Sequence, residues 1–295
     1  MKDVDKVCKR IEGFIAKSVE EFERDGVIVG ISGGVDSSVV ASLAVKAVGK
    51  ERVFGLIMPE RDTAKQNLED AKMFVDHLGI AHKIINLSKI LRPVGVYSKV
   101  EAQVMRSGAL ISKARGYFPK NAPGDIFTDT LVGVKNKWIS RGTAFYRIKH
   151  RMRMVLLYYY GERMNYLITG TANKTESLTG FFVKYGDGAA DIMPILPLFK
   201  TDVYEIARYL KVPQRIIEKP AMPDLIRTVT DEEVFGLKFP ILDKILRSLE
   251  SGKSVEETIE LYPNVDKAII RRVYTMRQKS LHMRCLPPYP TDLLS

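Results

Sequence analysis

A carboxylate, three hydroxyl groups and two glycines lie within seven residues, Ser32-Gly33-Gly34-Val35-Asp36-Ser37-Ser38. Adjacent glycines let an anion come close to the backbone, and serine hydroxyls can donate hydrogen bonds to phosphate oxygens. Asp36 would repel a phosphate unless a divalent cation such as Mg²⁺ lay between them. Together these residues predict a loop that binds nucleotide phosphates with a metal ion. The plainer alternative, a glycine turn that caps a helix, has no need of the aspartate and three serines.

The residues on either side predict the elements that hold this loop. Val27 to Ile31 form a β-branched apolar run typical of a buried strand, and the apolar residues from Val39 onward predict a helix. A loop leading from a strand into a helix N-terminus points free backbone N–H groups at an anion. Spacing excludes two other phosphate loops, because a Walker A loop needs Lys-Ser/Thr after its second glycine and a dinucleotide fingerprint needs a third glycine.

Strand and helix patterns alternate along most of the chain, which predicts a parallel α/β sheet whose ligands bind beyond the carboxyl ends of the strands. Met58 ends the second strand, with Pro59 and Glu60, and is expected near the adenine and ribose. The polar run 171–176 follows a later strand and is expected to face the loop. Strands are predicted at 27–31, 52–59, 81–87 and 166–170, and helices at 3–24, 63–78, 151–160, 202–210 and over much of 232–284.

The stretch from 91 to 143 interrupts this alternation of strand and helix patterns. It is rich in glycine and proline and holds the only tryptophan, Trp138. A connection this long within a compact domain predicts an inserted excursion. It is either a lid that acts at the site or a surface segment with a packing role, and a helix is predicted within it at about 98–114.

Composition limits the class of protein. With 295 residues, 45% of them hydrophobic, the chain can form one large domain or two small ones with a real core. It shows no run of about 20 apolar residues and no leader pattern, so a cytoplasmic protein without a membrane segment is expected. Cys8 and Cys285 fit neither a metal site nor a disulfide framework and are interpreted as inert thiols.

The formal net charge of +11 predicts acidic partners. ATP and a second nucleotide would account for part of this charge. Nucleic acid is the alternative, with 149–153 and Arg271-Arg272 as candidate contacts. These runs are short, so nucleic-acid binding is not expected.

The phosphate loop resembles the SGGxDS loop of the ATP pyrophosphatases, the PP-loop superfamily. Further motifs follow it in the order found in ammonia-dependent NAD synthetases, and this resemblance covers about residues 10–90 and 145–285. The motifs are R-x-R-M at Arg151–Met154, G-T-x-N-x-x-E at Gly170–Glu176, K-Y-G-D-G-x-x-D at Lys184–Asp191, P-I-x-x-L-x-K-T at Pro194–Thr201 and D-E at Asp231–Glu232.

This resemblance implies a fold and a reaction. The fold is a single α/β domain over 1–295 with a doubly wound parallel sheet, Rossmann-like and of the adenine-nucleotide α-hydrolase type. The reaction is the ATP-dependent amidation of deamido-NAD to NAD by ammonia, through an acyl-adenylate with release of pyrophosphate and AMP. A homodimer is expected, because the family builds its dinucleotide site across a dimer interface.

The resemblance also implies roles for individual residues. Asp36 and Lys200 are expected to be catalytic, and Asp36 and Glu176 to bind Mg²⁺. The residues expected to bind the dinucleotide are Arg151, Lys184, Asp191 and His282. The residues expected to bind ATP are Gly30, Ser32, Gly33, Gly34, Asp36, Ser37, Ser38, Met58, Thr171 and Lys200.

Departures from the family pattern lie on the acceptor side. Arg147 replaces an asparagine, Met222 a serine or threonine, and Met283 a lysine whose charge Arg284 could supply. An AMP-forming amide ligase for another carboxylate and a tRNA-modifying PP-loop enzyme therefore remain alternatives, as does a degenerate nucleotide-binding protein. Ammonia is the expected nitrogen source, because a glutaminase needs an activated nucleophile beside a base and Cys8 has no neighbouring histidine.

Overall fold

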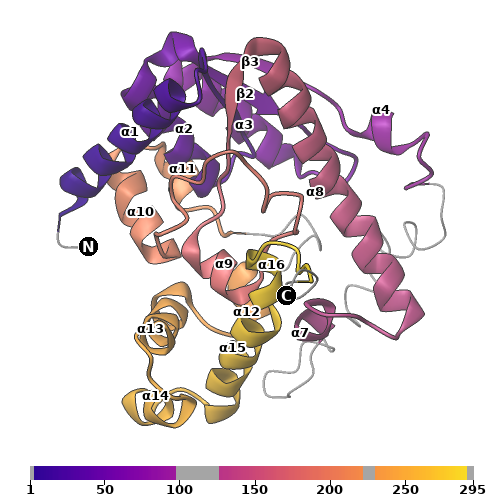
Figure 1. Ribbon diagram of the computed structural model, residues 1–295, viewed down its shortest axis with the longest axis vertical. Helices are drawn as coiled ribbons and strands as arrows, with labels where there is room; N and C mark the ends of the chain where they lie inside the picture. The colour runs from indigo at the N-terminus through magenta and orange to yellow at the C-terminus, as the bar shows by residue number, and fades with distance from the viewer. Residues whose placement is uncertain (1–2, 98–125, 222–229, 291–295) are drawn as a thin grey trace.

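Four parallel strands form a sheet in the computed structural model, which describes residues 3–97, 126–221 and 230–290. In β1, Val29 pairs with Gly55 of β2 on one side and with Thr169 of β4 on the other. A parallel bridge between Thr169 and Ile192 continues the sheet past β4. The predicted parallel α/β sheet is confirmed (Figure 1). The strands are β1 (Gly26–Gly30), β2 (Val53–Ile57), β3 (Ala81–Ile84) and β4 (Tyr166–Thr169), in the order β3-β2-β1-β4.

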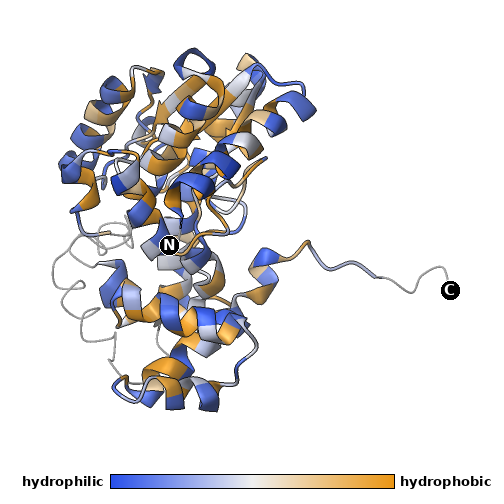
Figure 2. Cartoon of the chain, turned by 90° about the vertical axis from the view of Figure 1, so that its left-hand side faces the viewer, coloured by the Kyte–Doolittle hydropathy of each residue, from blue (hydrophilic) through white to orange (hydrophobic). Residues whose placement is uncertain are grey.

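Helices cover both faces of this sheet. Val27 and Val29 pack in the apolar cluster on one face, and Ile28 packs in the cluster on the other. A strand buried on both faces needs apolar residues throughout, which explains the run that begins at Val27. Figure 2 shows orange, hydrophobic residues on the elements in the upper part of the molecule, where the sheet lies. One face carries α1 (Val4–Glu21), α2 (Val35–Val48), α3 (Lys65–Leu78) and α10 (Lys200–Tyr209), and the other carries α8 (Lys137–Met164).

The C-terminal helices form a further apolar cluster of their own. Phe199, which directly precedes α10, belongs to this cluster, whereas Val203 of α10 belongs to the cluster under the sheet, so the start of α10 joins the two. The single domain over 1–295 stays a prediction. These helices are α12 (Asp231–Phe235), α13 (Phe239–Glu250), α14 (Val255–Leu261), α15 (Lys267–Lys279) and α16 (Leu281–Arg284). The shorter elements are η1 (Lys50–Arg52), α4 (Ser88–Leu91), α7 (Ile126–Thr130), α9 (Lys174–Thr179) and α11 (Gln214–Ile217).

The helix that carries Arg151 is longer than expected. It begins at Lys137, so the predicted insertion that starts at residue 91 ends there and not at residue 143. The first turns of α8 pack on neighbouring chain segments, as the contact between the Phe145 and Tyr97 rings shows, with 6.3 Å between centroids. They therefore lack the apolar period of a helix that faces a sheet.

Part of the tract also belongs to a core. Phe127 of α7 packs on Phe181 and Phe235, with ring centroids 5.5 and 6.5 Å away, and Leu131 is buried in the same cluster. The helix predicted at 98–114 lies outside the described residues, and the role of the tract as a lid stays a prediction.

The two basic runs serve contacts within the chain. Lys149 is buried and pairs with Glu60 at 3.0 Å, and Arg272 donates to the carbonyl of Phe235 at 2.7 Å. Arg271 pairs with Glu256 at 2.9 Å. Separately, none of the helices in the described ranges has the length and apolar character needed to cross a membrane.

Strand order places the carboxyl ends of the central strands beside one helix N-terminus. The chain leaves β1 through α2 to reach β2 on one side, whereas β4 lies on the other side of β1. In an open parallel sheet, a crevice forms where the strand order reverses, and ligands bind there. The loop Ser32–Gly34 lies at this position.

Candidate active site

The phosphate loop is held in shape by its own side chains. Ser32 N donates to Ser37 Oγ at 3.3 Å, and Gly34 N donates to Ser32 Oγ at 3.2 Å. Ser37 and Ser38 each donate from Oγ to the Gly34 carbonyl, at 3.0 and 2.9 Å. The helix α2 begins directly after Gly34, so its free N–H groups face the same space.

Gly33 is required by the backbone. It has a φ of +79°, and a Cβ at this position would lie 2.3 Å from the carbonyl oxygen of Asn67 in α3. The loop therefore packs directly on α3, and only glycine fits there.

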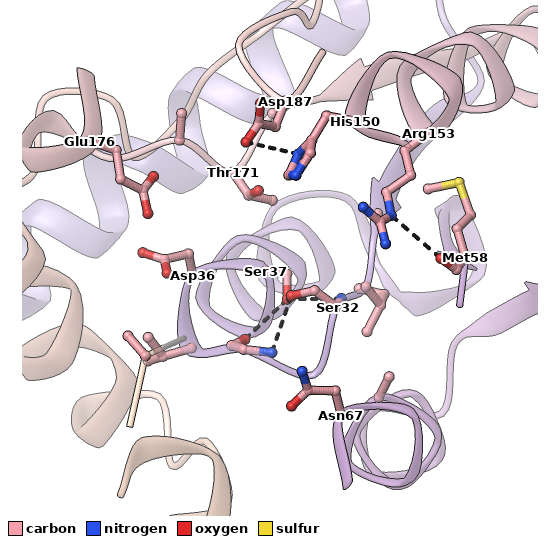
Figure 3. A pocket seen from close by; sticks show the side chains of 18 of the residues that line it. Ser32, Asp36, Ser37, Met58, Asn67, His150, Arg153, Thr171, Glu176 and Asp187 are labelled. Atoms are coloured by element: carbon pink, nitrogen blue, oxygen red, sulfur yellow. Dashed lines mark hydrogen bonds and ion pairs between the residues drawn. The ribbon is translucent and has the colours of Figure 1, made fainter. Parts of the chain in front are cut away.

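A lysine and two carboxylates meet in front of the loop. Lys200 Nζ lies 2.5 Å from Asp36 Oδ2 and 3.8 Å from Glu176 Oε1, and Lys200 is almost fully buried. Asn173 Nδ2 donates to Asp36 Oδ1 at 2.9 Å. Figure 3 shows the Asp36 and Glu176 carboxylates turned toward each other.

These charges shift one another's pKa values. Burial raises the pKa of Glu176 well above its usual range, and the nearby Asp36 carboxylate raises it further. Burial would lower the pKa of Lys200, but the carboxylates of Asp36 and Glu176 outweigh it and raise that pKa. Lys200 is therefore fully charged at neutral pH.

A buried hydrogen-bond network fixes the position of Lys200. Its backbone N–H donates to Thr175 Oγ1 at 2.9 Å, and Thr175 Oγ1 donates to Asp243 Oδ1 at 2.6 Å. Asp243 Oδ2 accepts from Thr201 N at 2.9 Å. Burial raises the pKa of Asp243. The network ties α9, α10 and α13 together. Sequence reasoning missed Asp243, although an aspartate on the apolar face of a helix was a usable signal.

A cavity of about 300 Å³ opens between the phosphate loop, the ends of β2 and β4, and α8. Most of the residues expected to bind ATP line it, together with the expected metal ligand Glu176. Gly33 and Ser38 are absent from this lining, and Ser38 is fully buried behind the loop. The expected residues that line the cavity are Gly30, Ser32, Gly34, Asp36, Ser37, Met58, Thr171, Glu176 and Lys200.

The residues at the end of β2 only partly match the prediction that they contact the adenine and ribose of ATP. Met58 and Pro59 line the cavity, but Glu60 is buried beside it. Glu60 accepts from Lys149 Nζ at 3.0 Å and from the Tyr97 hydroxyl at 2.6 Å. This carboxylate is thus committed to contacts within the chain.

Three of the four residues expected to bind the dinucleotide lie together. Lys184 Nζ donates to the His282 carbonyl at 2.8 Å, and Arg151 Nε donates to the Lys184 carbonyl at 3.4 Å. Asp191 instead accepts from Ile168 N at 2.9 Å and from the Tyr158 hydroxyl at 3.2 Å, at the end of β4.

The departures on the acceptor side are accounted for in part. Arg147 donates to the Thr130 carbonyl at 2.6 Å, which holds α8 to α7. Met283 is buried in the C-terminal cluster. Arg284 donates to the Ser177 carbonyl at 2.6 Å and to Ser280 Oγ at 2.7 Å, so its guanidinium serves the end of α9 and not an open charge site. Met222 lies outside the described residues.

Two cavity-lining groups were missed by sequence reasoning. Lys219 Nζ donates to the Gly33 carbonyl at 2.6 Å and to Asp70 Oδ2 at 2.7 Å, which fastens the phosphate loop to α3. His150 Nδ1 lies 3.3 Å from Asp187 Oδ2. Neither contact could be inferred from spacing, because its partners are about 40 or more residues apart in the chain. The position of His150 beside Arg151 was a weak signal.

A parallel sheet that ends at a Ser-Gly-Gly loop, with a lysine and two carboxylates beside it, defines a nucleotide-dependent α/β enzyme of the PP-loop type. The chain belongs to the NAD synthase family, whose model matches residues 7–137 and 127–287. The resemblance to ammonia-dependent NAD synthetases is thereby confirmed.

Similar proteins agree with this membership. The NH(3)-dependent NAD(+) synthetase of Thermotoga maritima is 43% identical over 244 residues, covering 83% of this chain and 87% of the relative. The corresponding protein of Methanocaldococcus jannaschii is 39% identical over 289 residues, covering 98% of each chain.

Solved structures with the same fold include two that cover 98% of this chain and 99% of their own. An NMN synthetase from Francisella tularensis has a TM-score of 0.72 at 26% identity. An NH3-dependent NAD synthetase from Campylobacter jejuni, in complex with the nitrate ion, has a TM-score of 0.68 at 28% identity.

Proposed function

We propose that this chain is a carbon-nitrogen ligase that amidates deamido-NAD to NAD with ammonia and ATP. The observation that carries the proposal is the meeting of Lys200 with Asp36 and Glu176 in front of the phosphate loop. The family membership and the relatives at 43% and 39% identity support the choice of reaction.

The chemistry has two steps. The nicotinate carboxylate attacks the α-phosphate of ATP, which forms an acyl-adenylate and releases pyrophosphate. Ammonia then attacks the acyl carbon and displaces AMP. Negative charge grows on the leaving pyrophosphate in the first step, so fixed donors and cations around it stabilise the transition state.

The chain supplies these donors from several elements. Ser32, Ser37, Thr171 and the first N–H groups of α2 would bind the phosphate oxygens, and Lys200 would balance the charge on the leaving group. Met58 would contact the adenine end of the cavity. All four named side chains and Lys200 line one cavity. Gly33 gives the loop its shape, and Ser38 supports it from behind.

The donor set in front of the loop fits Mg²⁺. Asp36 and Glu176 offer the hard carboxylate oxygens that Mg²⁺ prefers, and nucleotide phosphates with water complete such sites. Burial raises the pKa of Glu176 and repulsion from Asp36 raises it further, so a cation between the two carboxylates is favoured. The described residues hold no group of three or more histidine, cysteine or acidic side chains placed to bind a metal, so the nucleotide would have to share the ion. Bound Mg²⁺ would neutralise phosphate charge.

The dinucleotide would be held by Arg151, Lys184, Asp191 and His282, partly across a homodimer interface. The contacts that join Arg151, Lys184 and the chain at His282 support a shared site beside the middle of α8. The segment after α16 leads away from the body and exposes Leu286 and Tyr289, which suits contact with a second copy (Figure 2). Light scattering of the purified protein tests the dimer.

The cytoplasm is the proposed compartment. Both cysteines are free thiols, and Cys285 is exposed, which suits a reducing environment.

A second candidate is amidation of the carboxylate form of NMN. This candidate is favoured by the similarity to a structure named NMN synthetase. It is also favoured by Arg147 and Met283, which replace the family's usual residues on the acceptor side. Both candidates use the same ATP chemistry and differ only in the acceptor.

One experiment separates the candidates. The protein is incubated with ATP, MgCl₂ and ammonium chloride, and with either deamido-NAD or the carboxylate form of NMN, while AMP and the amide product are measured. We expect kcat/KM to favour deamido-NAD by at least about tenfold. A preference for the mononucleotide would select the second candidate, and AMP without either product would contradict both. Glutamine in place of ammonium should give no product.

A further inference from the structure

The imidazole ring of His150 faces the nucleotide cavity, and only one of its two nitrogens has a partner within the described part of the chain. His150 Nδ1 lies 3.3 Å from Asp187 Oδ2. Its Nε2 is buried, and the described residues give it no hydrogen-bond partner. Figure 3 shows the ring between Asp187 and Thr171, turned into the cavity that both His150 and Asp187 line. A buried polar nitrogen aimed at a binding cavity is costly unless a ligand uses it.

Both members of this pair are held in place. Asp187 Oδ1 accepts from Val183 N at 2.7 Å, which fixes the carboxylate. Tyr146 packs on the imidazole with 4.5 Å between ring centroids, and Gly186 leaves just enough room, since a Cβ there would lie 3.0 Å from the His150 Cβ. The geometry is therefore set before a ligand arrives.

The charge of Asp187 determines which nitrogen is free to accept a proton. Partial removal from water would raise the pKa of Asp187, but His150 and the Val183 amide outweigh it and lower that pKa. The carboxylate is therefore ionised near neutral pH and accepts the Nδ1–H of the ring. This tautomer leaves the Nε2 lone pair as a base directed at the cavity.

Other charged groups surround the cavity without occupying this nitrogen. On α8, Arg153 lies one turn further along and donates to the Met58 carbonyl at 3.4 Å, and Tyr146 lies one turn before. Across the cavity stand Asp36 and Glu176, each of which pairs with Lys200. Asp187 belongs to the Lys184–Asp191 motif and keeps 40% of its side chain exposed, so a proton held by the pair has a path to water.

We propose that His150 Nε2 accepts the proton that the attacking nitrogen loses in the amidation step, and that Asp187 positions the imidazole. This inference rests on the proposed function. The nitrogen of ammonia forms a bond to the acyl carbon, the bond from that carbon to the AMP oxygen breaks, and AMP leaves with the electron pair. One proton passes from nitrogen to His150 Nε2, and the imidazolium beside Asp187 then returns it to water.

The need for such a base follows from the amide product. Ammonia that has bonded to the acyl carbon carries a positive charge on nitrogen, and it must lose one proton to become the neutral amide. An imidazole nitrogen with a free lone pair can accept this proton. The adenylation step transfers no proton from nitrogen, so it should not need His150.

The test measures the two half-reactions separately in His150→Gln and His150→Ala. Pyrophosphate release from ATP and deamido-NAD without ammonium reports adenylation, and NAD formation against ammonium concentration from pH 6 to 9 reports amidation. We expect kcat/KM for ammonium to fall at least about 100-fold, with pyrophosphate release within about threefold of wild type. With kcat/KM expressed per free ammonia, which removes the ammonium equilibrium, the pH profile of His150→Gln should differ in shape from that of wild type, and added imidazole should partly restore His150→Ala.

Three further variants complete the design. His82→Gln changes an exposed histidine on β3 and should leave both half-reactions unchanged. Asp187→Asn should reduce amidation and shift the pH profile, and Asp187→Glu should recover part of the rate.

Three outcomes would overturn the proposal. The first is an unchanged kcat/KM and pH profile for ammonium in His150→Gln. The second is an equal loss in both half-reactions, which would make His150 a nucleotide-binding or folding residue. The third is wild-type protein that releases no pyrophosphate at all, in which case the proposed function fails and the proton role fails with it.

Discussion

Lys200 Nζ lies 2.5 Å from Asp36 Oδ2, so the cation beside the phosphate loop and the carboxylate within that loop neutralise each other. The two residues lie 164 positions apart in the sequence, and the contact joins the N-termini of α2 and α10. A buried lysine held this way is placed to exchange one anionic partner for another when phosphates enter the cavity.

Replacing Lys200 with methionine should separate its role in stability from its role in catalysis. Two carboxylates would face each other without a cation, and breaking a buried ion pair costs about 3–5 kcal/mol. Pyrophosphate release should fall by about 100-fold or more. The double variant Asp36→Asn with Lys200→Met should regain much of the unfolding free energy in urea but none of the activity. Recovery of activity in the double variant would show that Lys200 only balances Asp36.

Glu176→Gln should weaken metal dependence while keeping the local fold. The Glu176 carboxylate accepts from Asn173 N at 3.2 Å in the capping box of α9, and a glutamine oxygen can keep that bond. The Mg²⁺ concentration that gives half-maximal pyrophosphate release should rise at least about tenfold, because a carboxylate ligand is lost. Glu176→Ala loses the cap as well and serves as the comparison. An unchanged Mg²⁺ titration of Glu176→Gln would remove this residue from the metal site.

Gly33→Ala should damage both stability and ATP use. The φ of +79° and the approach of Asn67 oxygen to 2.3 Å from an added Cβ force the loop away from α3. We expect a loss of about 2 kcal/mol or more in unfolding free energy and a higher KM for ATP. Gly13→Ala is the matched control, because a Cβ there meets nothing within 4 Å in the middle of α1. That change should stabilise the protein by about 0.5–1 kcal/mol.

Asp62→Asn should destabilise the protein at neutral pH but not in acid. Burial would raise the pKa of Asp62, but Arg61 and Lys149 outweigh it and lower the pKa from 3.8 to about 2. A lowered folded-state pKa adds stability above the unfolded value, and this stability is lost as pH falls from about 4 to about 2. Urea unfolding from pH 7 to 3 should show a difference of about 2 kcal/mol that shrinks below pH 4. A constant difference at every pH would mean that packing, and not charge, is lost.

The sequence predicted those parts of the fold whose signal is local. The run Val27 to Ile31, the loop after it and the alternation of strands and helices led directly to the parallel sheet, since burial on both faces and glycine geometry leave clear patterns. The start of α8 was missed because Phe145 and Arg147 pack on neighbouring segments and show no sheet-facing period.

The site could be predicted only where its residues follow strand ends. Asp36, Thr171 and Glu176 lie beyond β1 and β4, so topology alone brought them together. Lys219, Asp243 and the His150–Asp187 pair depend on how distant segments pack, and no spacing in the chain encodes those contacts. Arg284 shows the converse, because its charge suggested a substrate contact and the fold uses it to bind the Ser177 carbonyl.

The basic run in α8 has a consequence for how this helix can change in evolution. Lys149 reaches the carboxylates beyond β2, His150 reaches Asp187, Arg151 reaches the Lys184 carbonyl and Arg153 reaches the Met58 carbonyl. Successive residues of an α-helix point about 100° apart, so one short run serves several neighbours around the circumference. Inserting or deleting a single residue before Lys149 would turn every one of these groups away from its partner at once. The length of α8 should therefore be far less tolerant of change than the identity of its exposed residues.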